Sequence, residues 1–254
     1  MIAALPMYDW PVLRPVNDRF WRAIAEHLHA AGIDAPERLT RQDDYGALWL
    51  RDDLLLAQTC GLPFNTRLRG RVRYVATPDH VFDGCREGRY SSAIVVGRHA
   101  DIPGDRADVL AGGRLAINGP DSWSGFVALQ HWFHDRGMAM PEPHLVSGGH
   151  LFSMQAVADG AADYAAIDSI AFGLASEHLP ELRNRLRVAG WTAEKPATPY
   201  ITALSASDDL VAALRQAIRD AIRAEPQLRR DLGLRDVSGF GEDVYASMRP
   251  LQTA

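Results

Sequence analysis

The feature that most constrains the fold is residues 117–126 (INGPDSWSGF), where a strand passes into a helix. The apolar run 114–117 before it predicts a buried strand, and the apolar segment 126–133 after it predicts a helix. The first N–H groups of a helix have no partner within the helix and lie at the positive end of its dipole. Ser122 and Ser124 therefore stand where an anion can be received, one as N-cap and the other free to turn to a ligand. Both can also serve only as helix caps, and these residues alone leave the two interpretations open.

Short apolar runs alternate with amphipathic segments along the chain, which is typical of an α/β protein with a mainly parallel sheet covered by helices. Arg67, Arg69, Arg71 and Arg73 alternate, so on a strand they would share one solvated face. Asn17 is a candidate cap for the first helix. The pattern predicts helices over 15–31, 45–51, 124–136, 151–159, 169–177, 208–223 and 227–232, strands over 2–7, 54–60, 72–77, 90–97, 114–118, 164–167, 186–191 and 200–205, and a polar tail over 239–248.

Composition excludes several classes of protein. The 254 residues are 47% hydrophobic and 23% charged, the balance of a globular protein with a sizeable core. A net charge of -5 argues against nucleic acid as a partner. The first residues have no basic region of a signal peptide, so the chain as written is expected in the cytoplasm, and no window is long enough to span a membrane.

Metal and disulfide chemistry depend on two cysteines. There is no CxxC motif and no cysteine–histidine cluster, so no structural metal is expected. Cys60 and Cys85 could pair in an oxidising compartment or remain free thiols, and the sequence leaves this open.

Polar residues follow other predicted strands and helix starts. Tyr8 ends the first strand, Asp168 ends the strand 164–167, and His150 follows two glycines at a helix start. Ligands of open α/β sheets bind beyond the carboxyl ends of strands, so these residues are candidates for one binding site. Each has a structural alternative: Tyr8 as a core aromatic, Asp168 as a helix cap and His150 as a surface or capping histidine.

Three short motifs, in this order, carry a family resemblance. They are the turn 122–125, the helix start 147–150, and the small-residue helix and alanine-rich strand over 156–168. Over roughly residues 2–223 the sequence resembles the phosphate, phosphite and phosphonate substrate-binding proteins of ABC transporters. These proteins are a branch of the type II periplasmic-binding-protein superfamily.

The resemblance implies two Rossmann-like α/β lobes joined by two crossover strands, with a ligand cleft between them. One lobe would comprise residues 1–90 plus 202–254, and the other residues 91–201. The implied protein is a monomer in the periplasm that clamps a small anion for an ABC permease or as a sensor, without cofactor or metal and without enzymatic activity. The implied ligand-binding residues are Tyr8, Ser122, Trp123, Ser124, His150 and Asp168.

The sequence departs from the family pattern in two places, and other functions remain open. Bulky Trp123 occupies a position where aminophosphonate binders commonly have a small hydroxyl residue, and Glu194 is the only candidate for a second acid that would hold a ligand amine. A serine hydrolase built from Ser122 or Ser124 with His150 and Asp168 is the first alternative, although the Gly-x-Ser-x-Gly elbow is missing. The same fold acting on a pyrimidine precursor, stacked on aromatic side chains, is the second.

Overall fold

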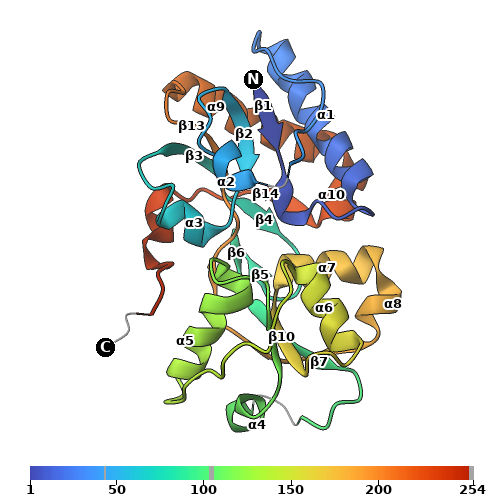
Figure 1. Cartoon of the computed structure of the whole chain (residues 1–254). Coiled ribbons are helices and arrows are strands. Elements are labelled where there is room, and N and C mark those ends of the chain that lie inside the picture. The colour runs from blue at the N-terminus through green and yellow to red at the C-terminus, as the bar shows by residue number, and fades with distance from the viewer. Residues whose placement is uncertain (43, 103–105, 252–254) are drawn as a thin grey trace. The chain divides into compact units, whose positions relative to one another are not determined.

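The computed structural model describes residues 1–42, 44–102 and 106–251, and it divides the chain into two compact units. Unit 1 comprises Met1–Val81, Arg86–Gly88 and Pro196–Ser247, and unit 2 comprises Phe82–Cys85, Arg89–Lys195 and the chain from Met248 onward. Figure 1 follows the chain through both units. These bounds differ from the expected lobes by a few residues at each passage, and the segment after residue 247 groups with unit 2.

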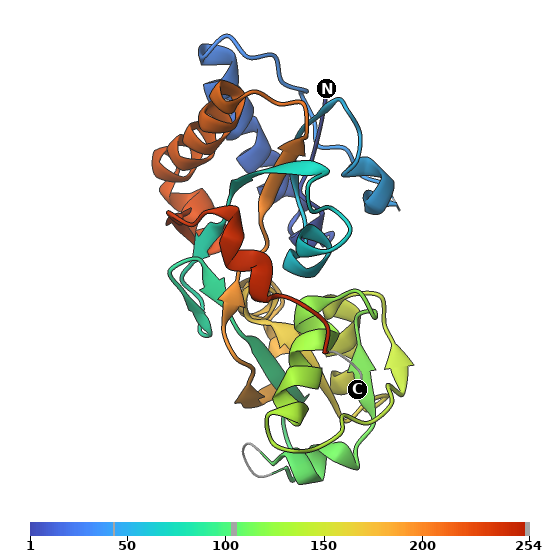
Figure 2. The same ribbon diagram turned by 90° about the vertical axis from the view of Figure 1, so that its left-hand side faces the viewer.

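Unit 1 is built on a four-stranded mixed sheet, which corrects the expectation of a mainly parallel one. The strand order is β1 (Ile2–Ala4), β2 (Leu54–Gln58), β13 (Tyr200–Ala203) and β3 (Val72–Ala76). Only β1 and β2 are parallel, because β13 is antiparallel to both of its neighbours. Helices α1 (Arg14–Ala30), α9 (Asp208–Ala224) and α10 (Pro226–Leu232) pack against one another in this unit (Figure 2).

Several short elements of unit 1 differ from the predictions. The first strand ends early, because the chain turns at Pro6 into a 3-10 helix, η1 (Pro6–Tyr8). Asn17 is buried inside α1 and donates to Tyr8 O and Asp9 Oδ1, so the prediction that it caps this helix is wrong. The predicted polar tail contains the 3-10 helix η3 (Glu242–Ser247). Helix α2 (Tyr45–Leu48) is shorter than expected. Three elements were not predicted: helix α3 (Gly61–Asn65) and the strands β4 (Pro78–His80) and β14 (Leu234–Val237), which pair with each other.

The arginine alternation does not form a strand face. Residues 66–71 form turns before β3 begins at Val72, so Arg73 is the one member of the series in that strand. The predicted shared face is therefore wrong. The turns leave the preceding arginines in a solvated segment, where Arg71 is exposed.

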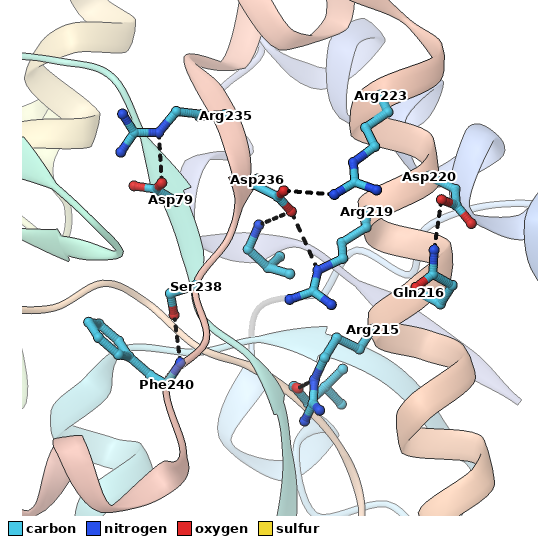
Figure 3. A network of polar contacts seen from close by, with 12 residues as sticks. Asp79, Arg215, Gln216, Arg219, Asp220, Arg223, Arg235, Asp236, Ser238 and Phe240 are labelled. Carbon is cyan, nitrogen blue, oxygen red and sulfur yellow. Dashed lines mark hydrogen bonds and ion pairs between the residues drawn. The ribbon is translucent and has the colours of Figure 1, made fainter.

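A network of arginines and aspartates joins α9 to the strand pair β4–β14 (Figure 3). Asp236 accepts a hydrogen bond from Arg223 Nη2 at 3.1 Å and lies 3.5 Å from Arg219 Nε. Arg219 and Arg223 are four residues apart, so they lie on the same face of the helix. Beside them, buried Asp79 accepts from Arg235 Nε at 2.8 Å and from the Gly88 N–H at 2.9 Å.

Unit 2 contains a five-stranded sheet in which three neighbouring strands are parallel. The order is β11 (Leu186–Trp191), β7 (Ser92–Gly97), β10 (Tyr164–Asp168), β8 (Leu115–Ile117) and β9 (Leu145–Val146). Strands β10, β8 and β9 are parallel, and β7 is antiparallel to both neighbours. The helical elements are α4 (Ala107–Ala111), η2 (Trp123–Val127), α5 (Ala128–His134), α6 (His150–Ala158), α7 (Ser169–His178) and α8 (Pro180–Arg183).

Alternating apolar residues of these strands build the core of unit 2. Ile94 and Val96 of β7, Leu115 of β8 and Tyr164 of β10 are almost completely buried against Phe133 of α5. Three two-residue strands lie where the chain passes between units: β5 (Cys85–Arg86), β6 (Arg89–Tyr90) and β12 (Lys195–Pro196).

Neither Cys60 nor Cys85 forms a disulfide in the described part of the chain, and Cys85 Sγ lies 3.2 Å from Ser169 Oγ. Within the described ranges, no helix is long and apolar enough to cross a membrane. The described residues also contain no group of three or more His, Cys, Asp or Glu side chains that could hold a metal ion.

Candidate anion-binding site

The parallel strands of unit 2 bring three predicted segments to one edge of the sheet. The turn containing Ser122 and Ser124 follows β8, the segment leading to His150 follows β9, and Asp168 is the last residue of β10. Because β10, β8 and β9 run in the same direction, their carboxyl ends lie at the same edge. Ligands of α/β sheets bind at such an edge.

The first of these segments is an unusually wound helix start. Ser122 is the N-cap, and its Oγ accepts a hydrogen bond from the Gly125 N–H at 3.0 Å. The Val127 N–H donates to Ser122 O at 3.1 Å, an i to i+5 bond that makes η2 a π-helical turn before the regular helix α5. Single π-helical turns occur frequently at functional sites. The helix predicted from Ser124 therefore begins at Trp123.

Ser124 meets the start of a second helix. Its side chain is 4% exposed, and its Oγ lies 2.9 Å from Nε2 of His150, the first residue of α6. Gly148 has a φ of 87°, in the left-handed region that favours glycine, and it allows the sharp turn into α6. Two helix N-termini are thus joined by one hydrogen bond between side chains 26 residues apart.

Burial sets the charge of His150. Its Nδ1 atom is inaccessible to solvent and has no hydrogen-bond partner within the described part of the chain. Burial lowers the pKa of His150 to about 3, so the imidazole is neutral at neutral pH. A neutral imidazole carries one N–H donor and one acceptor. In one tautomer Nε2–H donates to Ser124 Oγ and leaves the serine hydroxyl proton for a ligand.

Ser147 holds this second helix start in place. Its Oγ donates to Ile117 O at 3.1 Å and lies 2.7 Å from Ser153 Oγ. Ser153 in turn lies 3.4 Å from Asn118 Oδ1, in the turn after β8. Ser153 and Asn118 were not singled out from the sequence, because a serine inside a helix and an asparagine in a turn are common and carry no specific signal.

Asp168 acts as a helix cap in this structure. Its Oδ1 accepts hydrogen bonds from the Ile170 N–H at 2.7 Å and the Ala171 N–H at 3.1 Å, at the start of α7. The carboxylate is buried, so its charge is compensated by these N–H groups and by the helix dipole. The structural alternative considered from the sequence is therefore realised, and a contact with a ligand stays a prediction.

The indole of Trp123 is packed inside unit 2. It is 3% exposed, and its ring lies 5.5 Å from the His131 ring, centroid to centroid. Lys195 Nζ lies 5.6 Å from its centroid. This packing places the bulk of Trp123 in the protein interior, and its backbone N–H remains at the first position of the helix.

Tyr8 belongs to unit 1 and lies in η1, where the first strand was predicted to end. The side chain is 7% exposed and its ring makes an edge contact with the His80 ring, 6.4 Å between centroids. Its hydroxyl lies 3.5 Å from Thr198 Oγ1, which also accepts from Gln58 Nε2 at 2.9 Å. Thr198 and Gln58 were not predicted, because they lie far from Tyr8 in the sequence.

Two α/β units, one of them with helix N-termini at the carboxyl edge of its sheet, form the architecture of the periplasmic-binding-protein fold. The chain belongs to the family of periplasmic substrate-binding proteins of phosphonate ABC transporters, whose model matches residues 40–242. This is a family of transporter components, and its role is to bind a phosphonate anion as solute. No curated protein matches the sequence.

Solved structures share the fold at low sequence identity. The PhnD1 protein of Prochlorococcus marinus in complex with methylphosphonate is 15% identical, with a TM-score of 0.75 over 96% of this chain and 93% of that chain. A binding-protein component of a phosphonate ABC transporter from Pseudomonas aeruginosa is 14% identical, with a TM-score of 0.74 over 96% and 83%. A protein of Xanthomonas citri bound to ATP is 16% identical, with a TM-score of 0.68 over 97% and 95%.

Proposed function

We propose that this protein binds a phosphonate-type oxyanion at the helix starts of Trp123 and His150 and delivers it to an ABC permease. The observation that carries the proposal is the 2.9 Å contact between Ser124 Oγ and His150 Nε2. It joins two helix N-termini, whose first N–H groups have no acceptor within the helix, at the carboxyl edge of three parallel strands. The PhnD1 relative binds methylphosphonate, which makes this compound the first ligand to test.

Neutral donors suit such a ligand. Helix N-termini and hydroxyl groups donate to an anion without the desolvation cost of a buried cation. A phosphonate has three oxygen acceptors, so several N–H and O–H groups can share it. His150, neutral at pH 7, contributes no charge, and its Nε2–H orients Ser124 Oγ so that the serine proton is available to the ligand.

The geometry favours binding over hydrolysis. A serine nucleophile needs a base that a third group orients through its other ring nitrogen. The His150 Nδ1 atom has no such partner among the described residues, and the lowered pKa makes the imidazole a poor base. These observations support a protein without hydrolase activity.

Isothermal titration calorimetry tests the proposal. Wild-type protein is titrated with methylphosphonate, phosphate, phosphite and sulfate. We expect Ser124→Ala to weaken binding of the preferred oxyanion by roughly tenfold or more, because a lost donor to a charged ligand costs about 1.5–3 kcal/mol. His150→Phe should have a similar effect, because it removes the N–H that orients the Ser124 hydroxyl toward the ligand. Absence of binding by all four anions to the wild type would remove the proposal.

Two variants on exposed helix surfaces serve as matched controls. Ser176 is exposed on α7 and donates to Phe172 O within its own helix, so Ser176→Ala repeats the chemical change of Ser124→Ala away from the site. His134 is exposed at the end of α5 and controls for His150. We expect Ser176→Ala and His134→Phe to leave the dissociation constant within about twofold of the wild type.

The remaining predicted ligand residues have separate tests. If Asp168 pairs with a ligand amine, Asp168→Asn weakens binding of aminoethylphosphonate more than binding of methylphosphonate. If both affinities fall equally, Asp168 acts only as a helix cap. If Tyr8 donates its hydroxyl to the ligand, Tyr8→Phe weakens every phosphonate alike. Closure of the protein around its ligand is tested by solution scattering. Ligand should reduce the radius of gyration of the wild type and leave that of Ser124→Ala unchanged.

A further inference from the structure

We propose that a second pocket of unit 2, beside Lys195, binds a small aromatic carboxylate. The pocket has a volume of about 330 Å³, at the lower end of the range for small-molecule sites. All of its lining residues belong to unit 2, and neither Ser124 nor His150 is among them. Trp123 borders both sites: its backbone N–H lies at the helix start of the proposed oxyanion site, whereas its indole ring lines this second pocket.

Lys195 provides the charge. It is the only lysine in the sequence, and every other basic residue of the 27 lysines and arginines is an arginine. The side chain is half-buried, and its Nζ forms neither an ion pair nor a hydrogen bond with any residue in the described ranges. A partly desolvated ammonium without a directly bonded carboxylate is costly, and a bound ligand carboxylate would supply one.

The walls provide a surface for a planar ring. Trp191 is 37% exposed in the pocket, and Trp123 and Trp132 line it further in. Lys195 Nζ lies over the Trp123 ring, so the ammonium is held beside the aromatic walls. An aromatic ring stacked on an indole, with a carboxylate at its edge, matches both features at once.

The electrostatics of the pocket favour an anion. Arg136 lines the pocket together with Lys195, and Asp135 is the one carboxylate among its described lining residues. Asp135 is well exposed and lies 3.6 Å from His134 Nδ1, so solvent screens its charge, and no ion pair joins it to Lys195 in the described part of the chain. Desolvation, with a smaller contribution from the nearby Arg89, lowers the pKa of Lys195, and Asp135 opposes this shift. A bound carboxylate, as a second negative charge beside Lys195, would raise the pKa of Lys195 again.

The single lysine allows a direct test on the intact protein. Protein labelled with ¹³C at lysine Cε gives one lysine signal in NMR spectra, and that signal reports on the pocket. We expect benzoate to shift it saturably and to raise the pH at which the ammonium titrates. Acetate, which lacks the ring, and benzamide, which lacks the charge, should bind at least about tenfold more weakly. Equal binding by acetate, or no saturable shift with benzoate at millimolar concentrations, would overturn the proposal.

Variants separate the two binding sites. Lys195→Met and Trp191→Ala should each weaken benzoate binding by about tenfold or more in calorimetry, while their affinity for methylphosphonate stays at the wild-type value. Arg229→Met removes one exposed positive charge in unit 1, and Phe152→Ala removes an exposed aromatic ring of unit 2, so both control for nonspecific effects. Ser124→Ala should leave benzoate binding unchanged.

Competition between benzoate and methylphosphonate would place benzoate in the oxyanion site and overturn the proposal of a second pocket. Failure of the wild type to bind methylphosphonate, with benzoate binding intact, would contradict only the proposed function.

Discussion

Gly125 and Asn118 lie so close that no side chain fits between them. A Cβ atom on Gly125 would be 2.5 Å from Asn118 Cγ and 2.6 Å from its Oδ1. Gly125→Ala must therefore displace Asn118 and loosen the π-helical turn that carries Ser124. We expect a loss of about 1–3 kcal/mol in the free energy of unfolding, as for other overpacked sites, measured by urea denaturation. Methylphosphonate affinity should fall as well, because the turn presents the proposed donors.

Gly97→Ala is the matched control for this prediction. Gly97 ends β7 in the same unit, and a Cβ there has no neighbour within 4 Å. The control should change the free energy of unfolding by less than about 0.5 kcal/mol, as is usual for substitutions without close contacts. Equal stability of Gly97→Ala and Gly125→Ala would show that the Asn118 contact relaxes without cost.

Asp168 is predicted to stabilise unit 2 whatever its role with a ligand. Asp168→Ala leaves the Ile170 and Ala171 N–H groups without their buried acceptor. We expect it to lower the free energy of unfolding by about 1–2 kcal/mol, the usual cost of losing an N-cap. Asp168→Asn keeps one acceptor oxygen and should lose less. A fully stable Asp168→Ala in urea denaturation would contradict the capping role.

The network in Figure 3 permits a comparison between a buried and a more exposed carboxylate. Asp79 is buried and accepts from Arg235 and from the Gly88 N–H, so Asp79→Ala should cost about 1–3 kcal/mol for the donor left without its acceptor. Asp236 is more accessible, and Asp236→Ala should cost at most about 1 kcal/mol. The Asp236 effect should shrink in high salt, because exposed ion pairs are screened. Equal losses in denaturation experiments would contradict this order.

The sequence allowed the strand, turn and helix at the carboxyl edge of the unit 2 sheet to be predicted, because their signals are local. A strand, a turn with two serines and a helix follow one another within residues 114–134, and the hydrophobic pattern resolves each of them. The strand pattern over 164–168 was equally clear, because β10 is buried along its whole length.

Strand directions and side-chain partners could not be predicted, because they depend on contacts between distant segments. Strand β13 is antiparallel to β2 although about 140 residues separate them, and no local pattern encodes that pairing. The contact of Ser124 with His150 joined two residues that the sequence had selected separately. Trp123 was expected in the ligand site from its position, whereas the packing of its ring against His131 depends on how the turn folds.

Buried histidines should make stability depend on pH. His80 Nδ1 lies 3.1 Å from Leu232 O, and burial lowers the pKa of His80 to about 4. In the unfolded chain a histidine titrates near 6.5, so between about pH 6.5 and pH 4 the unfolded state binds more protons. The free energy of unfolding therefore falls as the pH is lowered through this window and is constant with respect to His80 above it. From pH 7.5 to pH 5 we expect His80 to account for a loss of roughly 2 kcal/mol, and the lowered pKa of His150 acts in the same direction. Urea denaturation at the two pH values measures this loss.

His80→Asn, which keeps a donor for Leu232 O, should lose less stability on acidification, whereas exposed His134→Asn should behave as the wild type. An unchanged pH dependence in His80→Asn would show that the pKa of His80 is the same in the folded and the unfolded protein.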